Sequence, residues 1–556
     1  MTVPLLATNI ILMNPPFATR REFLAGALAT GLVSLRGKTR TNLVPDQPST
    51  TPNYWCTWGA QNYAVDRATI QHLLSHSTLA SNLTERAVFG ANGWANAFPR
   101  VQRDLYIVFD VGWDVPAGTQ FDDARWKLGS QEVASDKFPS CTGNPTERLR
   151  KLNQLSRRAG WKGAGLWIPA QAPGDGRDGH LLPDSELERL FRERLRWSHD
   201  AGIGFWKVDY GVRNNASFRR WLTGLAREVA PGLQVEHSRG SCPLNDVYCP
   251  WEKGLACDDR GAFAVWGQGS VLKDSAAISS FADVFRTYDV TAQLSTATTL
   301  DRVVAVLSEV ASRPDAKGIV NCEDEPYLAA AFGLMMGVMR HPMALSETQA
   351  GVAYDPYETR RRVDEVTRAV RWQRLAPAFA MNSAHVLVSP DRFMDRWRFS
   401  AGETWADWVI GTTVGQSAPA CAARGLPLPE VSGVDRPFVI ASRNPNGAVS
   451  VASLPRVDAT RGRYEPLSEV TLTVPADTRL VGVFGRYALL RLSGITNVKR
   501  LLAQDLAGDS AEDITPEVTL GRGPLQIPGK VLARCGLSAA SPGDISSPGV
   551  VLHLES

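Results

Sequence analysis

The chain has 556 residues, of which 44% are hydrophobic and 21% are charged, and its 60 Lys and Arg nearly balance its 57 Asp and Glu, for a formal net charge of +3. This composition excludes a disordered chain, and the lack of long basic runs argues against a nucleic-acid-binding protein, whose affinity depends on clustered Lys and Arg. At about 100–200 residues per domain, the length predicts two or three domains. The 16 Trp and 11 Tyr supply flat amphipathic rings, which suit sugar binding as well as core packing.

Residues 1–45 predict a signal and linker segment rather than part of the fold. Arg20 and Arg21 precede an apolar run from Phe23 to Leu35, whose length of about 13 residues is short of the roughly 20 that span a bilayer but typical of a signal-peptide core. The paired arginines resemble the twin-arginine export signal, and an amphipathic first helix is the alternative. We therefore expect the twin-arginine export machinery as a partner, and a periplasmic or secreted location. No later stretch contains the roughly 18 uninterrupted apolar residues that indicate a membrane span, so we expect none.

The cysteines and histidines predict neither a metal site nor a cofactor. Cys242, Cys249 and Cys257 lie close together in the chain but lack the Cys-x-x-Cys spacing of structural zinc sites. A disulfide among them and buried free thiols both stay open, and free thiols are favoured because a twin-arginine substrate folds in a reducing cytosol. His72 and His76 are the only close pair of histidines, and no His-Glu-x-x-His motif is present.

Residues 46–382 predict a (β/α)8 TIM barrel, because short apolar runs alternate with segments of helical period. The expected strands are 54–58, 105–110, 165–169, 204–209, 233–237, 282–286, 318–321 and 343–346. The main expected helices are 145–159, 183–201, 216–229, 300–312, 327–340 and 358–376. Pro145 and Pro183 fit the first turns of helices, and Gly160 and Gly202 fit left-handed helix ends.

Residues 383–556 predict a C-terminal antiparallel β-sandwich domain, because helical period fades there and alternating segments replace it. The expected strands are 396–399, 404–410, 438–442, 449–453, 471–474, 479–484 and 550–554. The turn sequence from Asn444 to Gly447 (Asn-Pro-Asn-Gly) between two of them is typical of a hairpin.

Polar residues at the ends of the expected barrel strands are the candidates for an active site, which TIM barrels build at the carboxyl ends of their strands. They are Trp58, Asp110, Lys207, Asp209, Glu236, Arg286 and Asp289. In Lys207-Val208-Asp209 the period of two places both charged side chains on one face. Inside a barrel such charges are costly unless they are paired or functional, so a purely structural ion pair is the alternative interpretation.

These residues carry a resemblance. The segment Trp206-Lys207-Val208-Asp209 resembles the nucleophile strand of clan D glycoside hydrolases, the family 27 and 36 α-galactosidases and their relatives. Four other segments resemble motifs of these families in the same order: Trp55–Trp58 the Trp-containing first strand, Phe109–Trp113 the second-strand Asp-Asp-x-Trp motif, Phe285–Val290 the Trp-Arg-x-x-x-Asp-Ile segment, and Phe332–Ser346 the seventh helix and eighth strand.

The resemblance implies that Asp209 is the nucleophile and Asp289 the general acid/base of a retaining glycosidase. It also implies that several residues bind the sugar: Trp58, Asp110, Lys207 and Arg286, with Glu236 as a further hydroxyl contact. Trp113 and Trp206 are candidates to wall the pocket beside Trp58, and core packing is the alternative for each of these Trp.

The chemistry of these residues agrees with the implied roles. A retaining glycosidase keeps one carboxylate ionised and one protonated, about 5–5.5 Å apart. We expect Lys207 to stabilise the charged form of Asp209, and Arg286 to face the sugar or Asp209 rather than Asp289.

Two departures from the family pattern affect specificity and the acid/base. Val111 stands in place of the second Asp on the second strand, and Asp114 is the candidate to substitute for it. The segment before Asp289 is one residue shorter than in family 27, so Asp283 is a second candidate acid.

The sequence therefore predicts a retaining exo-glycosidase that acts on a terminal α-galactoside or a related sugar, with a carbohydrate as substrate and no nucleic acid as partner. Other clan D specificities stay open: β-L-arabinopyranosidase, isomaltodextranase-like activity and transglycosylation. A non-catalytic carbohydrate-binding barrel is the alternative from another class, and homo-oligomerisation stays open. A peptidase or phosphatase is disfavoured, because no Gly-x-Ser-x-Gly elbow, P-loop or metal cluster is present.

Overall fold

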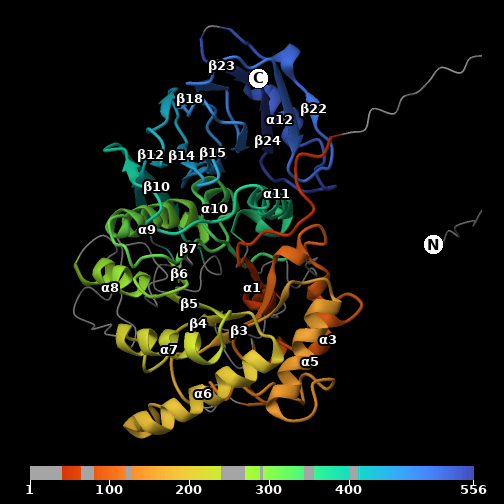
Figure 1. The fold of residues 1–556 in the computed structure, drawn as a ribbon, viewed down its shortest axis with the longest axis vertical. Helices are drawn as coiled ribbons and strands as arrows, with labels where there is room; N and C mark the ends of the chain where they lie inside the picture. The colour runs from red at the N-terminus through yellow and green to blue at the C-terminus, as the bar shows by residue number, and fades with distance from the viewer. Residues whose placement is uncertain are drawn as a thin grey trace, which may run out of the picture. The chain divides into compact units, whose positions relative to one another are not determined.

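The computed structural model describes residues 41–63, 80–119, 128–238, 269–287, 292–342, 356–400, 411, 413–521 and 523–556 (Figure 1). Several sequence predictions lie outside these residues: the export signal, the pair His72 and His76, and the cysteines Cys242, Cys249 and Cys257. None of the helices in the described ranges combines the length and the apolar character needed to cross a bilayer.

An eight-stranded parallel sheet forms the barrel, in the order β7-β6-β5-β4-β3-β2-β1-β8. Its strands are β1 Tyr54–Cys56, β2 Tyr106–Phe109, β3 Gly163–Ile168, β4 Phe205–Val208, β5 Gln234–Ser238, β6 Val284–Arg286, β7 Ile319–Asn321 and β8 Gly337–Val338. A parallel bridge between Asn321 and Met335 joins the end of β7 to the segment leading into β8, which closes the ring. The predicted TIM barrel is confirmed.

Helices cover the outside of the barrel (Figure 1). They are α1 Trp58–Tyr63, α3 Glu85–Phe89, α5 Pro145–Arg158, α6 Asp184–Ala201, α7 Ala216–Val229, α8 Gly269–Ser279, α9 Ser295–Val310, α10 Pro326–Phe332 and α11 Val363–Gln373. Asn144 caps α5 in a reciprocal capping box with Glu147. Gly160 and Gly202 follow α5 and α6 with φ of +95° and +73°, so the predicted left-handed helix ends are confirmed.

The prediction for the last barrel segment is partly wrong. A helix was expected over 327–340, but α10 ends at Phe332, because Gly333 has φ +67° and turns the chain. A β-carbon at Gly333 would collide with the ring of Phe379. The apolar residues that follow enter the barrel wall as β8, and the strand expected over 343–346 lies outside the described residues.

Side chains of the barrel strands alternate between its interior and the layer of helices. Tyr54, Phe205 and Val284 pack together inside the barrel as an apolar floor. On β4, Trp206 and Val208 belong instead to the core between the sheet and its helices. Lys207 therefore points inward above Phe205, as the period of two predicted.

The chain from Val386 onward is built from sheets. Its strands are β9 Val386–Val388, β10 Arg392–Arg398, β11 Thr413–Pro419, β12 Cys421–Arg424, β13 Glu430–Ser432, β14 Phe438–Arg443, β15 Val449–Leu454, β16 Arg456–Asp458, β17 Gly462–Tyr464, β18 Glu469–Thr473, β19 Leu480–Phe484, β20 Leu489–Ser493, β21 Arg500–Asp505, β22 Glu512–Asp513, β23 Leu525–Pro528 and β24 Gly549–Glu555, with one helix, α12 Gly529–Gly536.

Two of these sheets pack face to face as a sandwich. The sheet β22-β21-β24-β19-β15-β14-β12-β9 and the sheet β13-β18-β20-β23 share one core, to which Val451 and Leu490 belong. Most strand pairs are antiparallel as predicted, while β12–β14, β15–β19 and β18–β20 run parallel. The predicted hairpin between β14 and β15 is confirmed, with Gly447 at φ +91°.

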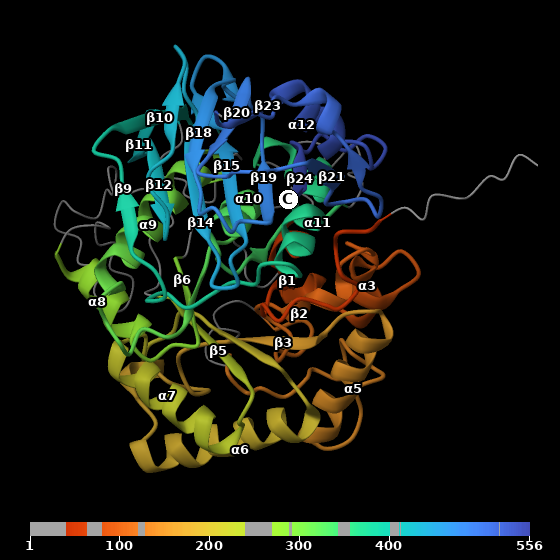
Figure 2. The same cartoon turned by 45° about the horizontal axis from the view of Figure 1, so that its top comes forward.

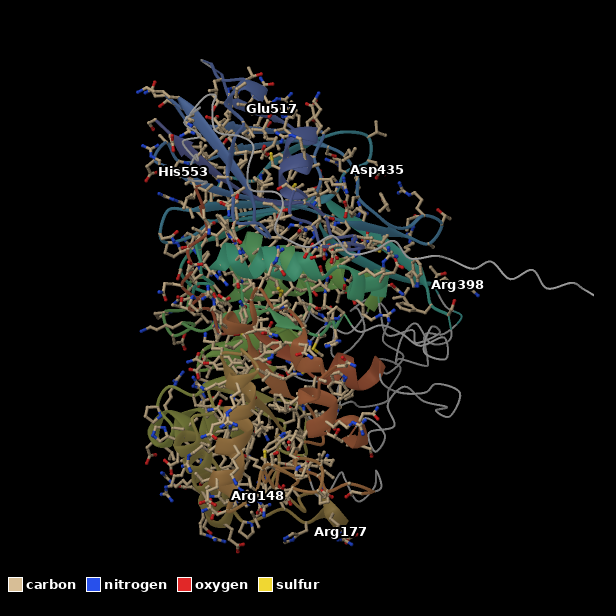
Figure 3. The ribbon with its side chains drawn as sticks, turned by 90° about the vertical axis from the view of Figure 1, so that its right-hand side faces the viewer. Arg148, Arg177, Arg398, Asp435, Glu517 and His553 are labelled. Carbon is tan, nitrogen blue, oxygen red and sulfur yellow. The ribbon has the colours of Figure 1, made fainter. Side chains whose placement is uncertain are left out.

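The larger sandwich sheet also packs on the barrel helices (Figure 2). On β14, Val439 faces the sandwich core, whereas Phe438 and Ile440 belong to the core of the barrel. In Figure 3, the green helices α10 and α11 lie between the barrel, which carries Arg148 and Arg177, and the sandwich, which carries Asp435. The boundary expected near residue 382 stays a prediction, because the apolar packing is continuous across it.

Candidate active site

A cluster of buried charges occupies the carboxyl ends of the barrel strands. It consists of Asp110 after β2, Lys207 on β4, Asp209 after β4, Glu236 on β5, Arg286 at the end of β6 and Glu323 after β7. Each of these residues is at most 7% exposed. Parallel strands in a closed ring present their carboxyl ends at the same rim, so residues from distant parts of the chain meet there.

Lys207 pairs with Asp110 rather than with Asp209. Its Nζ lies 2.9 Å from Asp110 Oδ2, 3.6 Å from Cys56 Sγ and 3.9 Å from Glu323 Oε1. Asp110 Oδ2 also accepts a hydrogen bond from the Cys56 thiol. Lys207 also lowers the pKa of Asp209, as expected, although Arg286 has the larger effect.

Arg286 is the counter-charge that Asp209 uses. Its guanidinium joins three carboxylates: Nη2 lies 3.1 Å from Asp209 Oδ1, Nη1 3.0 Å from Glu323 Oε1, and Nε 3.1 Å from Glu236 Oε1. The expectation that Arg286 faces Asp209 is confirmed. Such a planar fork holds several carboxylates in fixed directions, which a single ammonium does not.

Asp209 is held in its ionised form. Burial alone would raise its pKa, but the charges of Arg286 and then Lys207, with a hydrogen bond from Trp167, outweigh burial and bring the pKa below its ordinary value. Trp167 Nε1 donates to Asp209 Oδ2 over 3.0 Å. A carboxylate that stays charged near neutral pH, with both oxygens oriented, has the properties of a nucleophile.

Glu236 lies opposite Lys207 in the β4–β5 register and is fully buried. Its Oε1 accepts a hydrogen bond from the Tyr54 hydroxyl and its Oε2 accepts one from Asn321 Nδ2. Burial raises the pKa of Glu236 to about 7, against the opposing charge of Arg286. Both carboxylate oxygens of Glu236 therefore have donors within the protein. These hydrogen bonds fix the carboxylate beside the guanidinium of Arg286.

The three Trp considered for the pocket differ in their surroundings. Trp58 is partly exposed and packs beside Trp167 and Val111. Trp113 is fully buried, and its indole N–H donates to the carbonyl of Trp167. Trp206 is fully buried on the outside of β4 and donates to Ser198 of α6. Of the three, Trp58 is the one that keeps part of its surface exposed.

The candidate acid/base Asp289 lies outside the described residues. Its distance from Asp209 therefore stays a prediction. The second candidate, Asp283, precedes β6 at the amino end of the strand. Its carboxylate pairs with Arg227 at 3.0 Å and accepts the backbone N–H of Val235. Asp283 is thus at the opposite end of the strand from Arg286.

Val111, which stands in place of the second Asp, is a buried residue of an apolar cluster. It packs with Val115, Leu128 and Trp167. Asp114, the candidate substitute for the missing carboxylate, accepts the backbone N–H groups of Gly129 and Gln131 through Oδ2. That oxygen therefore orders a loop of the protein, while Oδ1 has no hydrogen-bond partner within the described ranges.

Sequence reasoning missed Glu323 and Trp167. Glu323 follows the expected strand 318–321 by two residues, so the rule that selected the other strand ends would also have selected it. Trp167 lies in the expected strand 165–169, but a Trp in a strand is usually a packing residue. Nothing in the sequence says that its indole reaches Asp209.

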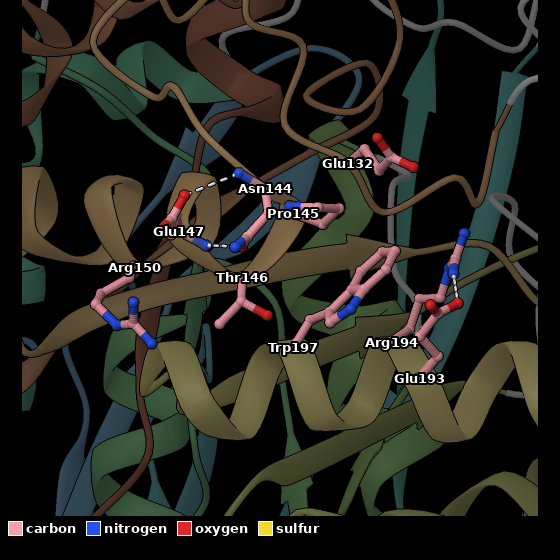
Figure 4. A pocket seen from close by; sticks show the side chains of 9 residues that line it. All are labelled: Glu132, Asn144, Pro145, Thr146, Glu147, Arg150, Glu193, Arg194 and Trp197. Carbon is pink, nitrogen blue, oxygen red and sulfur yellow. Dashed lines mark hydrogen bonds and ion pairs between the residues drawn. The ribbon is translucent and has the colours of Figure 1, made fainter.

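A pocket of about 710 Å³ lies away from this cluster, on the outer surface between α5 and α6 (Figure 4). Its polar groups already pair with one another: Arg194 with Glu193, and Glu147 with Asn144. Arg194 also stacks over Trp197. Among the described residues, no group of three His, Cys, Asp or Glu is placed to hold a metal ion.

No protein-family model and no curated protein matches the sequence. Solved structures similar to this chain include α-galactosidase I from Mortierella vinacea, at 10% identity over 91% of this chain and 97% of that one, with a TM-score of 0.36. Another is the α-galactosidase from Saccharomyces cerevisiae with raffinose, at 9% identity over 92% and 100%, with a TM-score of 0.34. A third is the α-amylase from Geobacillus thermoleovorans complexed with acarbose, at 8% identity over 92% and 100%, with a TM-score of 0.37. Because these identities and TM-scores are low, the barrel assignment rests on the strand pairing above, and any function rests on the site residues.

Proposed function

We propose that this chain is a retaining exo-glycosidase that hydrolyses a terminal α-galactoside or a related sugar by double displacement. The observation that carries the proposal is Asp209: a buried aspartate, ionised by Arg286 and oriented by Trp167, at the carboxyl end of a barrel strand. A purely structural ion pair would explain Lys207 and Asp110. It gives no reason for the three further carboxylates around Arg286, which are Asp209, Glu236 and Glu323.

In the proposed reaction, Asp209 attacks the anomeric carbon while Asp289 gives its proton to the departing glycosidic oxygen. A covalent glycosyl-enzyme forms, and Asp289 then takes a proton from the water that hydrolyses it. Protonation of the leaving oxygen by a positioned acid typically contributes 10²–10⁴-fold. The role of Asp289 comes from the sequence resemblance, while that of Asp209 is supported by its contacts.

One observation favours a second specificity within the same chemistry. Val111 stands where the family pattern has a second Asp, and its apolar side chain offers no hydrogen bond to a sugar hydroxyl or hydroxymethyl group. A β-L-arabinopyranoside has the ring stereochemistry of an α-galactoside and no hydroxymethyl group, so it is the second candidate substrate. The export-type segment in 1–45 adds the proposal that the enzyme acts in the periplasm or outside the cell.

A panel of p-nitrophenyl α- and β-glycosides, including α-galactoside and β-L-arabinopyranoside, tests the function. We expect the wild type to hydrolyse one of them, and Asp209→Ala to lose on the order of 10⁴-fold in kcat, because the nucleophile is removed. Glu228→Gln is the control, since Glu228 is an exposed carboxylate of α7 that pairs with Arg192 on the surface.

Three outcomes would contradict the proposal. Equal rates for wild type and Asp209→Ala would reject Asp209 as the nucleophile. A 2-fluoro-glycoside that labels a residue other than Asp209 would do the same. A sugar-dependent rise in Tm without turnover of any glycoside would favour the non-catalytic carbohydrate-binding barrel.

A further inference from the structure

Glu323 has one carboxylate oxygen bound and the other free. Its Oε1 lies 3.0 Å from Arg286 Nη1 and 3.9 Å from Lys207 Nζ. Its Oε2 has no hydrogen-bond partner among the described residues, and water does not reach it either, because the side chain is only 1% exposed. Folded proteins keep few such oxygens, because a buried acceptor without a donor loses its hydrogen bonds to water and gains nothing in return.

Among the described residues, the charged and amide donors beside Glu323 have other partners. Lys207 bonds to Asp110 at 2.9 Å, and Arg286 divides its guanidinium among Asp209, Glu236 and Glu323. Asn321, two residues earlier in the chain, donates to Glu236 and to Tyr54. A donor for Glu323 Oε2 is therefore expected from a molecule that enters the site.

The position of Glu323 next to Asp209 indicates the class of that molecule. Adjacent nitrogens of one guanidinium, Nη1 and Nη2 of Arg286, hold Glu323 and Asp209. A molecule that places an anomeric carbon at Asp209 therefore lies beside Glu323, and a sugar ring presents hydroxyl donors all around its edge.

We infer that Glu323 is a specificity-determining residue, whose Oε2 accepts a hydrogen bond from one ring hydroxyl of the sugar bound at Asp209. This inference rests on the proposed glycosidase function. The electrostatics of Glu323 agree with this role. Burial raises the pKa of Glu323, although the charges of Arg286 and Lys207 oppose the rise. A hydroxyl that donates to the ionised carboxylate would lower that pKa.

The test compares the p-nitrophenyl glycoside that the wild type hydrolyses with its monodeoxy analogues, each of which lacks one hydroxyl of the sugar. We expect one analogue to lose about 10- to 100-fold in kcat/KM with the wild type, the usual worth of a hydrogen bond to a charged group.

In Glu323→Asp the carboxylate keeps its charge toward Lys207 and Arg286 but is drawn back by one methylene. The penalty for that one analogue should then fall below about 3-fold, while the other penalties stay unchanged. In Glu323→Gln, which places an amide N–H₂ where the acceptor was, the same penalty should fall.

The control is Asp324→Asn, the next residue in the chain. Asp324 binds Arg340 at 3.0 Å and the backbone N–H of Met339, so its variant disturbs the same loop without touching the free oxygen. Its profile across the analogues should match that of the wild type. Circular dichroism and Tm identify any variant that does not fold, and Glu323→Asp, as the smaller change, then decides.

Four results would overturn the inference. One is a uniform loss in the Glu323 variants with an unchanged analogue profile, which would mean that Glu323 only positions Arg286. Another is the same altered profile in Asp324→Asn. A third is a wild type for which no single deoxygenation matters. In these three cases the glycosidase proposal stands. The fourth result is a wild type that hydrolyses no glycoside of the panel, which would contradict both the glycosidase proposal and the role of Glu323.

Discussion

Asp209 shows how a buried carboxylate stays charged without a dedicated partner of its own. Arg286 is shared with Glu236 and Glu323, and Lys207 is committed to Asp110, so two cations serve four carboxyls. The indole N–H of Trp167 adds a neutral donor to the Asp209 carboxylate. In a dry site, such a charge-assisted hydrogen bond stabilises the ionised form more than it would in water.

Trp167→Phe should therefore make the proposed nucleophile harder to ionise. Removing a donor to the charged form raises the pKa of Asp209, so the acidic limb of the kcat/KM profile should move up by about one pH unit, with roughly a 10-fold lower rate at low pH. The measurement is the pH–rate profile. Trp206→Phe is the matched control, since its indole donates to Ser198 on the other side of the barrel wall. If both variants shift the profile equally, the Trp167 hydrogen bond does not set this pKa.

At the scale of elements, the short helix α10 and the strand β8 show where local pattern fails. Residues Tyr327–Met339 form one apolar stretch, and by composition such a stretch continues as a helix. Instead Gly333 adopts φ +67°, which places β8 in the barrel wall next to β1. A single glycine is a weak signal inside an apolar run, and here its importance comes from Phe379, which packs against it from a later segment.

Gly333→Ala should lower the free energy of unfolding by more than about 2 kcal/mol, because it combines left-handed backbone strain with a collision against Phe379. Gly224→Ala in α7 is the matched control. A β-carbon there meets nothing within 4 Å, and alanine should stabilise the helix by about 0.5–1 kcal/mol. Urea unfolding measures both. A neutral Gly333→Ala would show that the turn after α10 does not need glycine.

Over the whole molecule, the barrel and the sandwich are joined by buried contacts rather than by a linker. Arg368 of α11 lies 2.9 Å and 3.2 Å from the two carboxylate oxygens of Asp505 on β21, and it also donates to the carbonyl of Ser547. The sheet residues Phe438 and Ile440 extend the barrel core into the sandwich. Two layers that share apolar packing and a buried ion pair are expected to unfold together.

Arg368→Ala should cost about 3–5 kcal/mol, because it leaves the buried Asp505 without its counter-charge. The loss should appear in one transition, with tryptophan fluorescence and circular dichroism coinciding during denaturant unfolding. Arg534→Ala is the control, since its pairs with Glu512 and Glu517 are exposed and should contribute no more than about 1 kcal/mol. Separate transitions for the two probes in the wild type would contradict a shared core.

The sequence by itself determined the features that depend on neighbours along the chain. The helix limits at Pro145 and Gly202, the alternation of strands and helices, and the inward direction of Lys207 all follow from local preference and period. Only the tertiary structure decided which charges meet. The partner of Lys207 is Asp110 and not Asp209, and Glu323 joins the cluster, because these contacts depend on the relative register of strands that are far apart in the chain.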